Sequence, residues 1–177
     1  LLCQLGMLFQ KNALFDSMTV GHNIAFPLRE VTSKSEVEID GIVDRFLEAV
    51  GLSHAKTLFP DEISGGMQKR LGIARALALN QKIIFYDDPS AGLDPITSRK
   101  IIDLIKKMQK ENESTVIAIT NDMNRAYQMA DRIAMVVDKA VINTGSIEET
   151  KLNSDLRVRQ FIRGQLEGPL TSIAEAS

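Results

Sequence analysis

The residues best suited to bind a phosphate lie at positions 64–67, directly before a predicted helix. They are Ser64, Gly65, Gly66 and Met67. A serine and two glycines at the start of a helix leave backbone N–H groups exposed, and the helix dipole adds a positive potential there. Such a place binds a phosphate oxygen without a charged side chain. The alternative is a plain helix start, in which Ser64 only caps the helix and the glycines only form a turn.

Two adjacent carboxylates, Asp87 and Asp88, follow the apolar run 83–86 and precede Pro89. Neighbouring carboxylates at the end of a buried strand are costly unless they share a cation or a proton. In phosphoryl transfer, the first can hold a Mg²⁺-bound water and the second can orient the attacking water. An ordinary junction between a strand and a turn is the alternative.

Two further polar residues belong with these segments by position. Asp94 lies in the tight loop 90–95, which follows the carboxylates and is suited to a dimer interface. Gln10 follows the apolar run that ends at Phe9, and its neutral amide can reach a Mg²⁺ ion or its water. Gln10 carries no meaning alone, so its role depends on the other segments.

The elements that position these residues alternate between helices and strands, which predicts an α/β protein. Ser35 and Glu38 form a capping box for a helix that ends before Gly51. Further helices are predicted from about 65 to 79, from Asp94 onward and over 126–130. Strands are predicted over 1–9, 83–86, 115–119, 133–137 and 140–143. The strand at 83–86 is expected to be covered on both faces and that at 115–119 to be buried. The last pair encloses a turn at 138–139, and the last dozen residues are predicted to be an irregular tail.

The composition indicates a globular protein, because 44% of the 177 residues are hydrophobic and 25% are charged. A net charge of -2 gives no electrostatic reason to expect a nucleic acid partner. Three basic pairs are interpreted as solvated helix faces. They are Lys69–Arg70, Arg99–Lys100 and Lys106–Lys107. The single cysteine, Cys3, excludes an intramolecular disulfide, and no run approaches the roughly 18 to 20 apolar residues of a membrane helix.

The order of the chemical segments resembles that of ABC transporter ATPases, over nearly the whole chain to about residue 163. The matching segments are Gln10, Ser64–Gly66, Asp87–Pro89, Gly92–Asp94 and Thr120–Asp122. The resemblance implies ATP and Mg²⁺ as cofactors. It makes Gln10 the Q-loop glutamine, a catalytic residue that also contacts the metal ion. It makes Ile63–Gln68 the signature loop, whose Ser64, Gly65, Gly66 and Met67 bind the nucleotide.

The same resemblance assigns the remaining site residues. Asp87 is the Walker B aspartate and a metal ligand, and Asp88 holds the position of the catalytic carboxylate. Asp94 is the D-loop aspartate at the bound nucleotide. Asn121 falls on the catalytic switch position, where the family usually has histidine.

The fold implied by the resemblance is a partial P-loop NTPase (RecA-like) core with the ABC α-helical subdomain inserted. It would lack the N-terminal Walker A strand, loop and helix. The expected parts are a core strand at 1–10, the helical subdomain at 11–80, the ATPase core at 81–150, and a C-terminal helix and loose tail at 151–177.

A narrower resemblance is to the Mla/Ttg2-type ATPases, which power phospholipid movement between the membranes of Gram-negative bacteria. It rests on Met7–Gln10, Ala13–Phe15, Asn23–Arg29, Met67 and Arg157–Phe161. It implies a second ATPase subunit, forming a homodimer, together with membrane permeases and an accessory subunit, and no nucleic acid. The location implied is the cytoplasmic face of the bacterial inner membrane.

Two segments allow two interpretations each. The stretch Asn12–Arg29 is the expected permease contact, but its apolar residues fit the core of the helical subdomain equally well. The arginines of 155–163 form either a solvated helix face or a docking element for a partner subunit.

The sequence departs from the family pattern at three places. No Gly-x-x-x-x-Gly-Lys-Ser/Thr phosphate loop occurs, and in the family that loop lies upstream of the Q-loop. We therefore expect the chain to be part of a longer product and to bind Mg-ATP poorly alone. Asp88 replaces the usual glutamate, which withdraws the carboxylate by roughly 1 Å. Asn121 replaces histidine and cannot carry a proton near pH 7.

Both replacements predict slow hydrolysis with nucleotide binding retained. The alternative function is a non-catalytic, nucleotide-dependent dimerisation or regulatory subunit of an ABC complex. A soluble ABC protein of repair or translation is a third, disfavoured because the sequence shows neither a second cassette nor a long coiled coil.

Overall fold

The computed structural model describes residues 5–9 and 13–174, and the chain divides into two compact units. The first unit comprises residues 1–121 and the second residues 122–177. None of the helices in the described ranges is long and apolar enough to cross a membrane.

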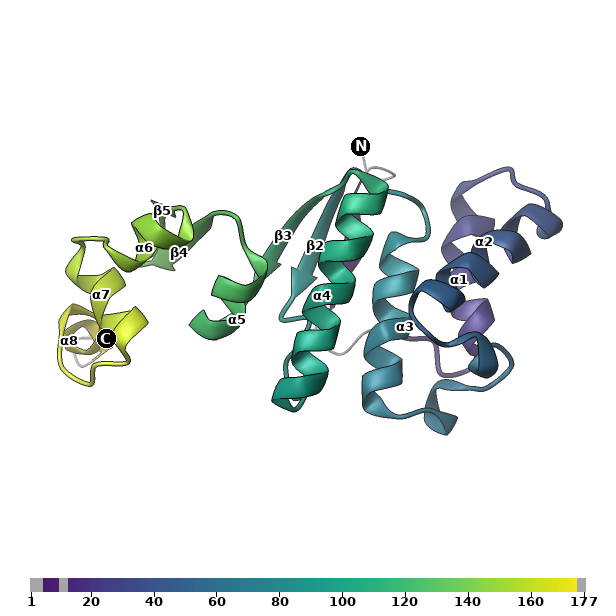
Figure 1. The fold of residues 1–177 in the computed structure, drawn as a ribbon, viewed down its shortest axis with the longest axis horizontal. Coiled ribbons are helices and arrows are strands. Elements are labelled where there is room, and N and C mark those ends of the chain that lie inside the picture. The colour runs from purple at the N-terminus through teal and green to yellow at the C-terminus, as the bar shows by residue number, and fades with distance from the viewer. Residues whose placement is uncertain (1–4, 10–12, 175–177) are drawn as a thin grey trace. The chain divides into compact units, whose positions relative to one another are not determined.

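The first unit is built on a parallel sheet of three strands in the order β1, β2, β3 (Figure 1). The strands are β1 (Leu5–Leu8), β2 (Ile83–Asp87) and β3 (Thr115–Ile119). Leu5 pairs with Ile83, and Ile83 pairs with Thr115, so all three carboxyl ends lie at one edge. The predicted α/β class is confirmed.

Between β1 and β2 the chain forms a group of helices. They are α1 (Val20–Val31), α2 (Glu36–Ala49), the 3-10 turns η2 (Ser53–Ala55) and η3 (Pro60–Glu62), and α3 (Gly65–Leu77). The capping box of α2 is present as predicted, with both hydrogen bonds made between Ser35 and Glu38. Gly51 takes the left-handed conformation expected just past that helix, with φ 68°. Helix α1 packs on both α2 and α3.

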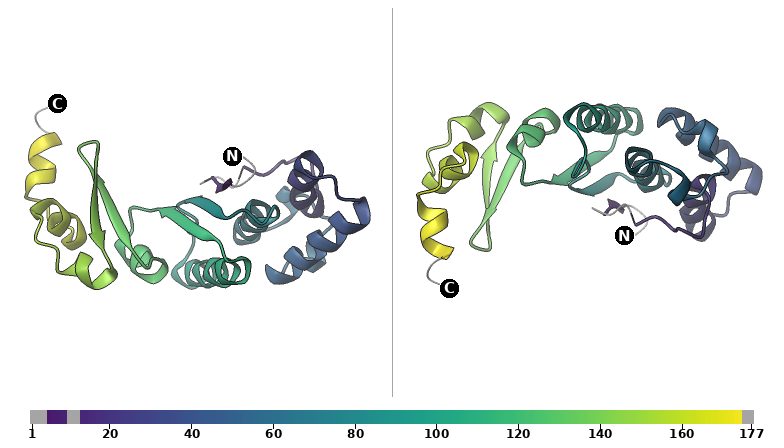
Figure 2. Two further views of the ribbon diagram at one scale, coloured as in Figure 1. Left: turned by 90° about the horizontal axis from the view of Figure 1, so that it is seen from above. Right: turned by 90° about the horizontal axis from the view of Figure 1, so that it is seen from below.

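One face of the sheet is covered and the other is open within the described residues. Helix α4 (Pro95–Asn112) connects β2 to β3, and α3 and α4 lie on the same side of the sheet (Figure 2). Leu8, Ile84 and Tyr86 point to that side and are buried. On the opposite face, Met7 is 51% exposed and Ile119 66% exposed.

The expectations that β2 is covered on both faces and that β3 is buried are therefore wrong for the described chain. Ile83 in β2 is partly exposed, as is Ile117 in β3, because no described element packs over their side of the sheet. An apolar run without alternation does not report whether one face or two are covered.

The second unit begins with α5 (Met123–Met129), which starts three residues before the predicted position. Strands β4 (Ile133–Val137) and β5 (Ala140–Gly145) pair antiparallel. Asp138 and Lys139 form the predicted turn, with φ values of 50° and 62°. Three helices follow: α6 (Ile147–Lys151), α7 (Leu156–Arg163) and α8 (Pro169–Ala174). The last of these replaces part of the predicted irregular tail.

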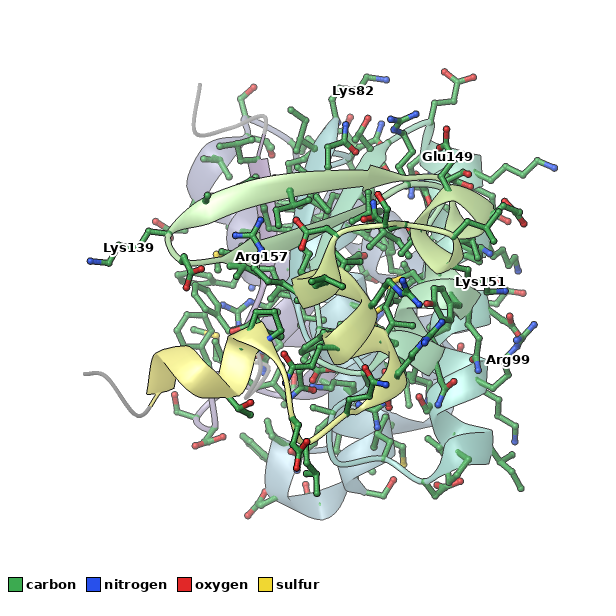
Figure 3. The ribbon with its side chains drawn as sticks, turned by 90° about the vertical axis from the view of Figure 1, so that its left-hand side faces the viewer. Lys82, Arg99, Lys139, Glu149, Lys151 and Arg157 are labelled. Atoms are coloured by element: carbon green, nitrogen blue, oxygen red, sulfur yellow. The ribbon has the colours of Figure 1, made fainter. Side chains whose placement is uncertain are left out.

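An arginine joins α7 to the turn of the hairpin. Arg157 contacts Asp138 at 3.7 Å and its own helix cap, Asp155, at 2.7 Å. Figure 3 shows Arg157 beneath the hairpin and Lys139 extending from its end. Arg157 is thus a structural residue of this unit and not part of a wholly solvated helix face.

Candidate functional site

The predicted phosphate-binding loop is an exposed helix start. Ser64 caps α3, because its Oγ accepts a hydrogen bond from the Met67 N–H at 3.3 Å. Among the described residues, a Cβ added to Gly65 would meet no atom within 4 Å, whereas one added to Gly66 would contact Thr97 Cγ2 at 3.5 Å. Ser64 and Gly65 are therefore exposed at the positive end of a 13-residue helix.

Asp94 caps the neighbouring helix, α4. Its Oδ1 accepts hydrogen bonds from the N–H groups of Ile96 and Thr97, both at 3.0 Å. Hydrogen bonding to Thr97 lowers the pKa of Asp94 below its usual value, which keeps this carboxylate ionised at neutral pH. Because Thr97 lies beside Gly66, the structure brings the starts of α3 and α4 together.

The paired carboxylates lie where β2 ends. Asp87 is the last residue of β2, and Asp88 begins the turn with φ 40°. Its N–H donates to the Ile119 carbonyl of β3 at 2.9 Å, and its own carbonyl accepts from Ala91 N–H at 3.1 Å. Aspartate is among the few residues enriched in the left-handed region, so this backbone suits Asp88.

Asn121 lies just past the same edge of the sheet as the carboxylates. Asp87 pairs with Ile119, and Asn121 follows Ile119 by two residues in an exposed position. Residues 87, 88 and 121 thus lie at or just past the carboxyl ends of adjacent parallel strands, where open α/β sheets bind their ligands. Gln10 lies outside the described residues.

Sequence reasoning missed Lys69, which is buried at 4% exposure and not on a solvated helix face. Burial lowers its pKa, while the charges of Asp88 and Asp87 act in the opposite direction. A cation of α3 therefore lies within electrostatic reach of the paired carboxylates. The signal in the sequence was the apolar environment of α3, in which Leu71, Ile73 and Ala74 are all buried.

Arg70 is also structural, because its Nη1 donates to the Val50 carbonyl at 2.6 Å and so ties α3 to the end of α2. By contrast, the predictions for the pairs at 99–100 and 106–107 are confirmed, since all four residues are exposed.

The donor set fits Mg²⁺ better than a metal that needs a closed cage of side chains. Within the described ranges, no group of three or more histidine, cysteine, aspartate or glutamate side chains is placed to hold a metal ion. Mg²⁺ keeps several waters and takes one or two protein carboxylates together with phosphate oxygens. Asp87, half-buried at the strand end, offers such a carboxylate.

The parallel sheet with two carboxylates at its edge defines an α/β domain, and comparison with known proteins identifies its family. The ABC transporter family model matches residues 2–91, so the chain belongs to that family. Its curated relatives include the ATP-binding protein MlaF of the intermembrane phospholipid transport system. The chain is 41% identical to MlaF of Haemophilus influenzae over 94% of its length, and 39% identical to that of Escherichia coli K12.

Another relative carries a different transport name. The probable ribonucleotide transport ATP-binding protein mkl of Mycobacterium tuberculosis H37Rv is 42% identical over 93% of the chain. The chain covers 63% of the Haemophilus MlaF and 46% of mkl, so it spans less than two thirds of these relatives.

A solved structure supports the fold. The ATP-binding cassette MJ0796, in a dimeric post-hydrolysis state bound to ADP and Pi, aligns with a TM-score of 0.69 and 32% identity. The alignment covers 79% of this chain and 62% of that protein. The predicted fold and family are therefore confirmed.

Proposed function

We propose that the full-length protein is the ATP-binding and hydrolysing subunit of an ABC transporter that energises phospholipid transport across the bacterial envelope. The observation that carries this proposal is the joint arrangement of Asp87, Asp88 and Asn121 at the edge of adjacent parallel strands. The family membership and the similarity to MlaF agree with it.

In this proposal the carboxylates and the switch residue have separate roles. Asp87 holds Mg²⁺, which neutralises phosphate charge when bound. Asp88 orients the attacking water, and Asn121 donates from its amide to a phosphate oxygen. Gln10 contacts the metal ion or its water.

The signature residues act on a second subunit. Ser64, Gly65, Gly66 and Met67 bind the nucleotide of the partner, and Asp94 lies at the same interface. The space beside Gly65, where no described residue lies within 4 Å of an added Cβ, supports this role, because a phosphate can approach the backbone there. Ile96, 70% exposed beside Asp94, provides apolar surface for the contact.

The permease contact is assigned to the part of Asn12–Arg29 that the structure leaves accessible. Val20, Ile24 and Leu28 are buried in the helical group and belong to its core. Asp16 and Ser17 are exposed before α1, and they provide a polar contact surface. The assembly would therefore lie against the cytoplasmic face of the bacterial inner membrane, with a further accessory subunit.

A non-catalytic role is the second candidate, favoured by the short carboxylate of Asp88 and the missing histidine at 121. In that case ATP would close a dimer without turnover. The two functions are separated by the rate of repeated hydrolysis.

The test uses the full-length protein with its permease in phospholipid vesicles, with phosphate release measured over many turnovers. We expect slow, Mg²⁺-dependent hydrolysis together with transfer of labelled phospholipid, and loss of both in Asp88→Asn. Asparagine also tolerates the left-handed backbone, so this variant should fold. ATP-dependent dimerisation with no turnover would replace the proposal by the regulatory role. Hydrolysis that is stimulated by a ribonucleotide other than ATP but not by phospholipid would overturn phospholipid as the transported substrate.

A further inference from the structure

We propose that Arg75 is a positioning residue that fastens the segment 13–19 to the signature helix α3, and so links the position of that segment to the signature loop. The inference rests on the proposed function, because it concerns how the same site is coordinated. Ala13 stands three residues after Gln10 in the chain.

Arg75 makes two contacts with this segment from the last turn of α3. Its Nη1 donates a hydrogen bond to the Ala13 carbonyl, and its guanidinium carbon lies 4.5 Å from the centre of the Phe15 ring. A guanidinium over an aromatic face is an attractive contact that strengthens when water is excluded. Burial lowers the pKa of Arg75. The guanidinium nevertheless stays charged, because arginine is not deprotonated in proteins near neutral pH.

Phe15 is itself held from two directions. Its ring meets that of Phe26 on α1 edge to face, with centroids 4.7 Å apart. Its N–H donates to Asn23 Oδ1 at 2.9 Å, and its carbonyl accepts from Asn23 Nδ2 at 3.1 Å. These contacts fix the position of Phe15, so its ring can hold the guanidinium of Arg75 in place.

Asn23 extends this fastening along the segment. Its side chain is fully buried, and its Nδ2 lies within hydrogen-bond distance of the carbonyls of Met18 and Thr19, at 3.0 and 3.1 Å. Asn23 thus joins residues 15–19 of the segment to α1. Arg75 joins the beginning of the segment, at Ala13 and Phe15, to α3.

The two ends of α3 therefore contact different parts of the proposed site. The signature residues 64–66 lie at its start, while Arg75 near its end holds Ala13, which has an uncommon left-handed φ of 49°. Because a helix is rigid over 13 residues, a displacement of the segment after Gln10 is carried to the signature loop through Arg75. A contact of this kind aligns the site without touching the nucleotide.

The experiment compares Arg75→Met, Arg75→Lys and Phe15→Leu in the full-length protein with its permease. Turnover is measured against ATP concentration, and hydrogen exchange is measured for the backbone of residues 13–19. Arg99→Met is the matched control, because Arg99 is an exposed helix arginine of the same unit whose partner is Asp103.

We expect Arg75→Met to lower kcat by about tenfold to a hundredfold, the range that a misplacement of about 1 Å produces. KM for ATP should stay within about twofold, and exchange over 13–19 should accelerate. Arg75→Lys should recover part of kcat, since lysine can make one of the two contacts. Arg75→Met combined with Phe15→Leu should cost less than the sum of the two single changes, because both remove the contact between the guanidinium and the Phe15 ring.

Unchanged kcat in Arg75→Met, or a loss that Arg99→Met reproduces, would overturn the inference. If the wild-type protein does not hydrolyse ATP, the proposed function fails and hydrogen exchange decides the inference by itself. Exchange over 13–19 that is the same in Arg75→Met and wild type would then overturn it. A variant that fails to fold leaves Arg75→Lys and Phe15→Leu to give the same two measurements.

Discussion

At the scale of single residues, backbone conformation and side-chain chemistry oppose each other at Asp88. Its φ of 40° suits aspartate, whereas the longer glutamate of the family pattern is not favoured there. In the proposed site, the aspartate would therefore satisfy the turn while its shorter side chain holds the carboxylate farther from the substrate. Asn121, at the edge of the same sheet, cannot supply the positive charge that histidine would.

We predict that the double change Asp88→Glu with Asn121→His raises the turnover of the full-length protein, by up to about a hundredfold if carboxylate position limits the rate. The melting temperature should fall, because glutamate is less suited to the left-handed turn. Steady-state phosphate release and thermal unfolding of the same samples test both. No gain in turnover would show that these two residues do not limit hydrolysis.

At the scale of secondary-structure elements, locally determined features were predictable and those set by distant packing were not. The capping box at Ser35 and the turn at Asp138–Lys139 depend on a few adjacent residues, so the sequence indicated both. Helix α1 was not predicted as a separate helix, and Pro27 inside it is locally unfavourable; its packing on α2 and α3 outweighs the missing N–H.

The candidate site shows the same division. The loop at 64–66 and the carboxylates at 87–88 were predicted from residue type and order. The apolar residues of α3 signal that this helix is buried, but burial of Lys69 itself depends on what surrounds the helix in three dimensions. Coverage of the sheet likewise depends on elements distant in sequence.

Helix α7 gives a prediction for acidic pH. Its cap, Asp155, accepts hydrogen bonds from the Arg157 side chain and backbone, and these lower its pKa to about 2 from an ordinary 3.8. Since the folded-state pKa is the lower one, the stability from this cap is present in full above pH 3.8. It should be lost as the pH falls from there through about 2.

Titration of the Asp155 carboxyl by NMR should give the depressed midpoint. The melting temperature of Asp155→Asn should vary less with pH over this window, while the amide still caps α7. A midpoint for Asp155 at the ordinary value would contradict the ion pair with Arg157.

At the scale of the whole molecule, the exposed starts of α3 and α4 predict an assembly of two subunits. Full-length Asp88→Asn should form a dimer in Mg-ATP that dissociates when the nucleotide is removed. The same protein with Gly65→Val added should remain monomeric under the same conditions. The subunit itself should accommodate the substitution, because a Cβ there has no neighbour within 4 Å among the described residues.

Sedimentation of both variants with and without Mg-ATP measures this difference, and circular dichroism confirms that Gly65→Val is folded. A dimer of Gly65→Val as stable as that of its parent would place the interface elsewhere.

The register of the sheet also dictates an order of folding. Leu5 pairs with Ile83, so β1 cannot pair with β2 until 78 further residues have been made. Helices α1, α2 and α3 lie within that interval and pack on one another, so they can condense during synthesis. Pairing β1 with β2 then closes a long loop, a contact of the non-local kind that slows folding. Until that step, Leu8, which is buried in the folded structure, lacks its neighbour Tyr86 on β2, and the nascent chain is more prone to aggregate during this interval.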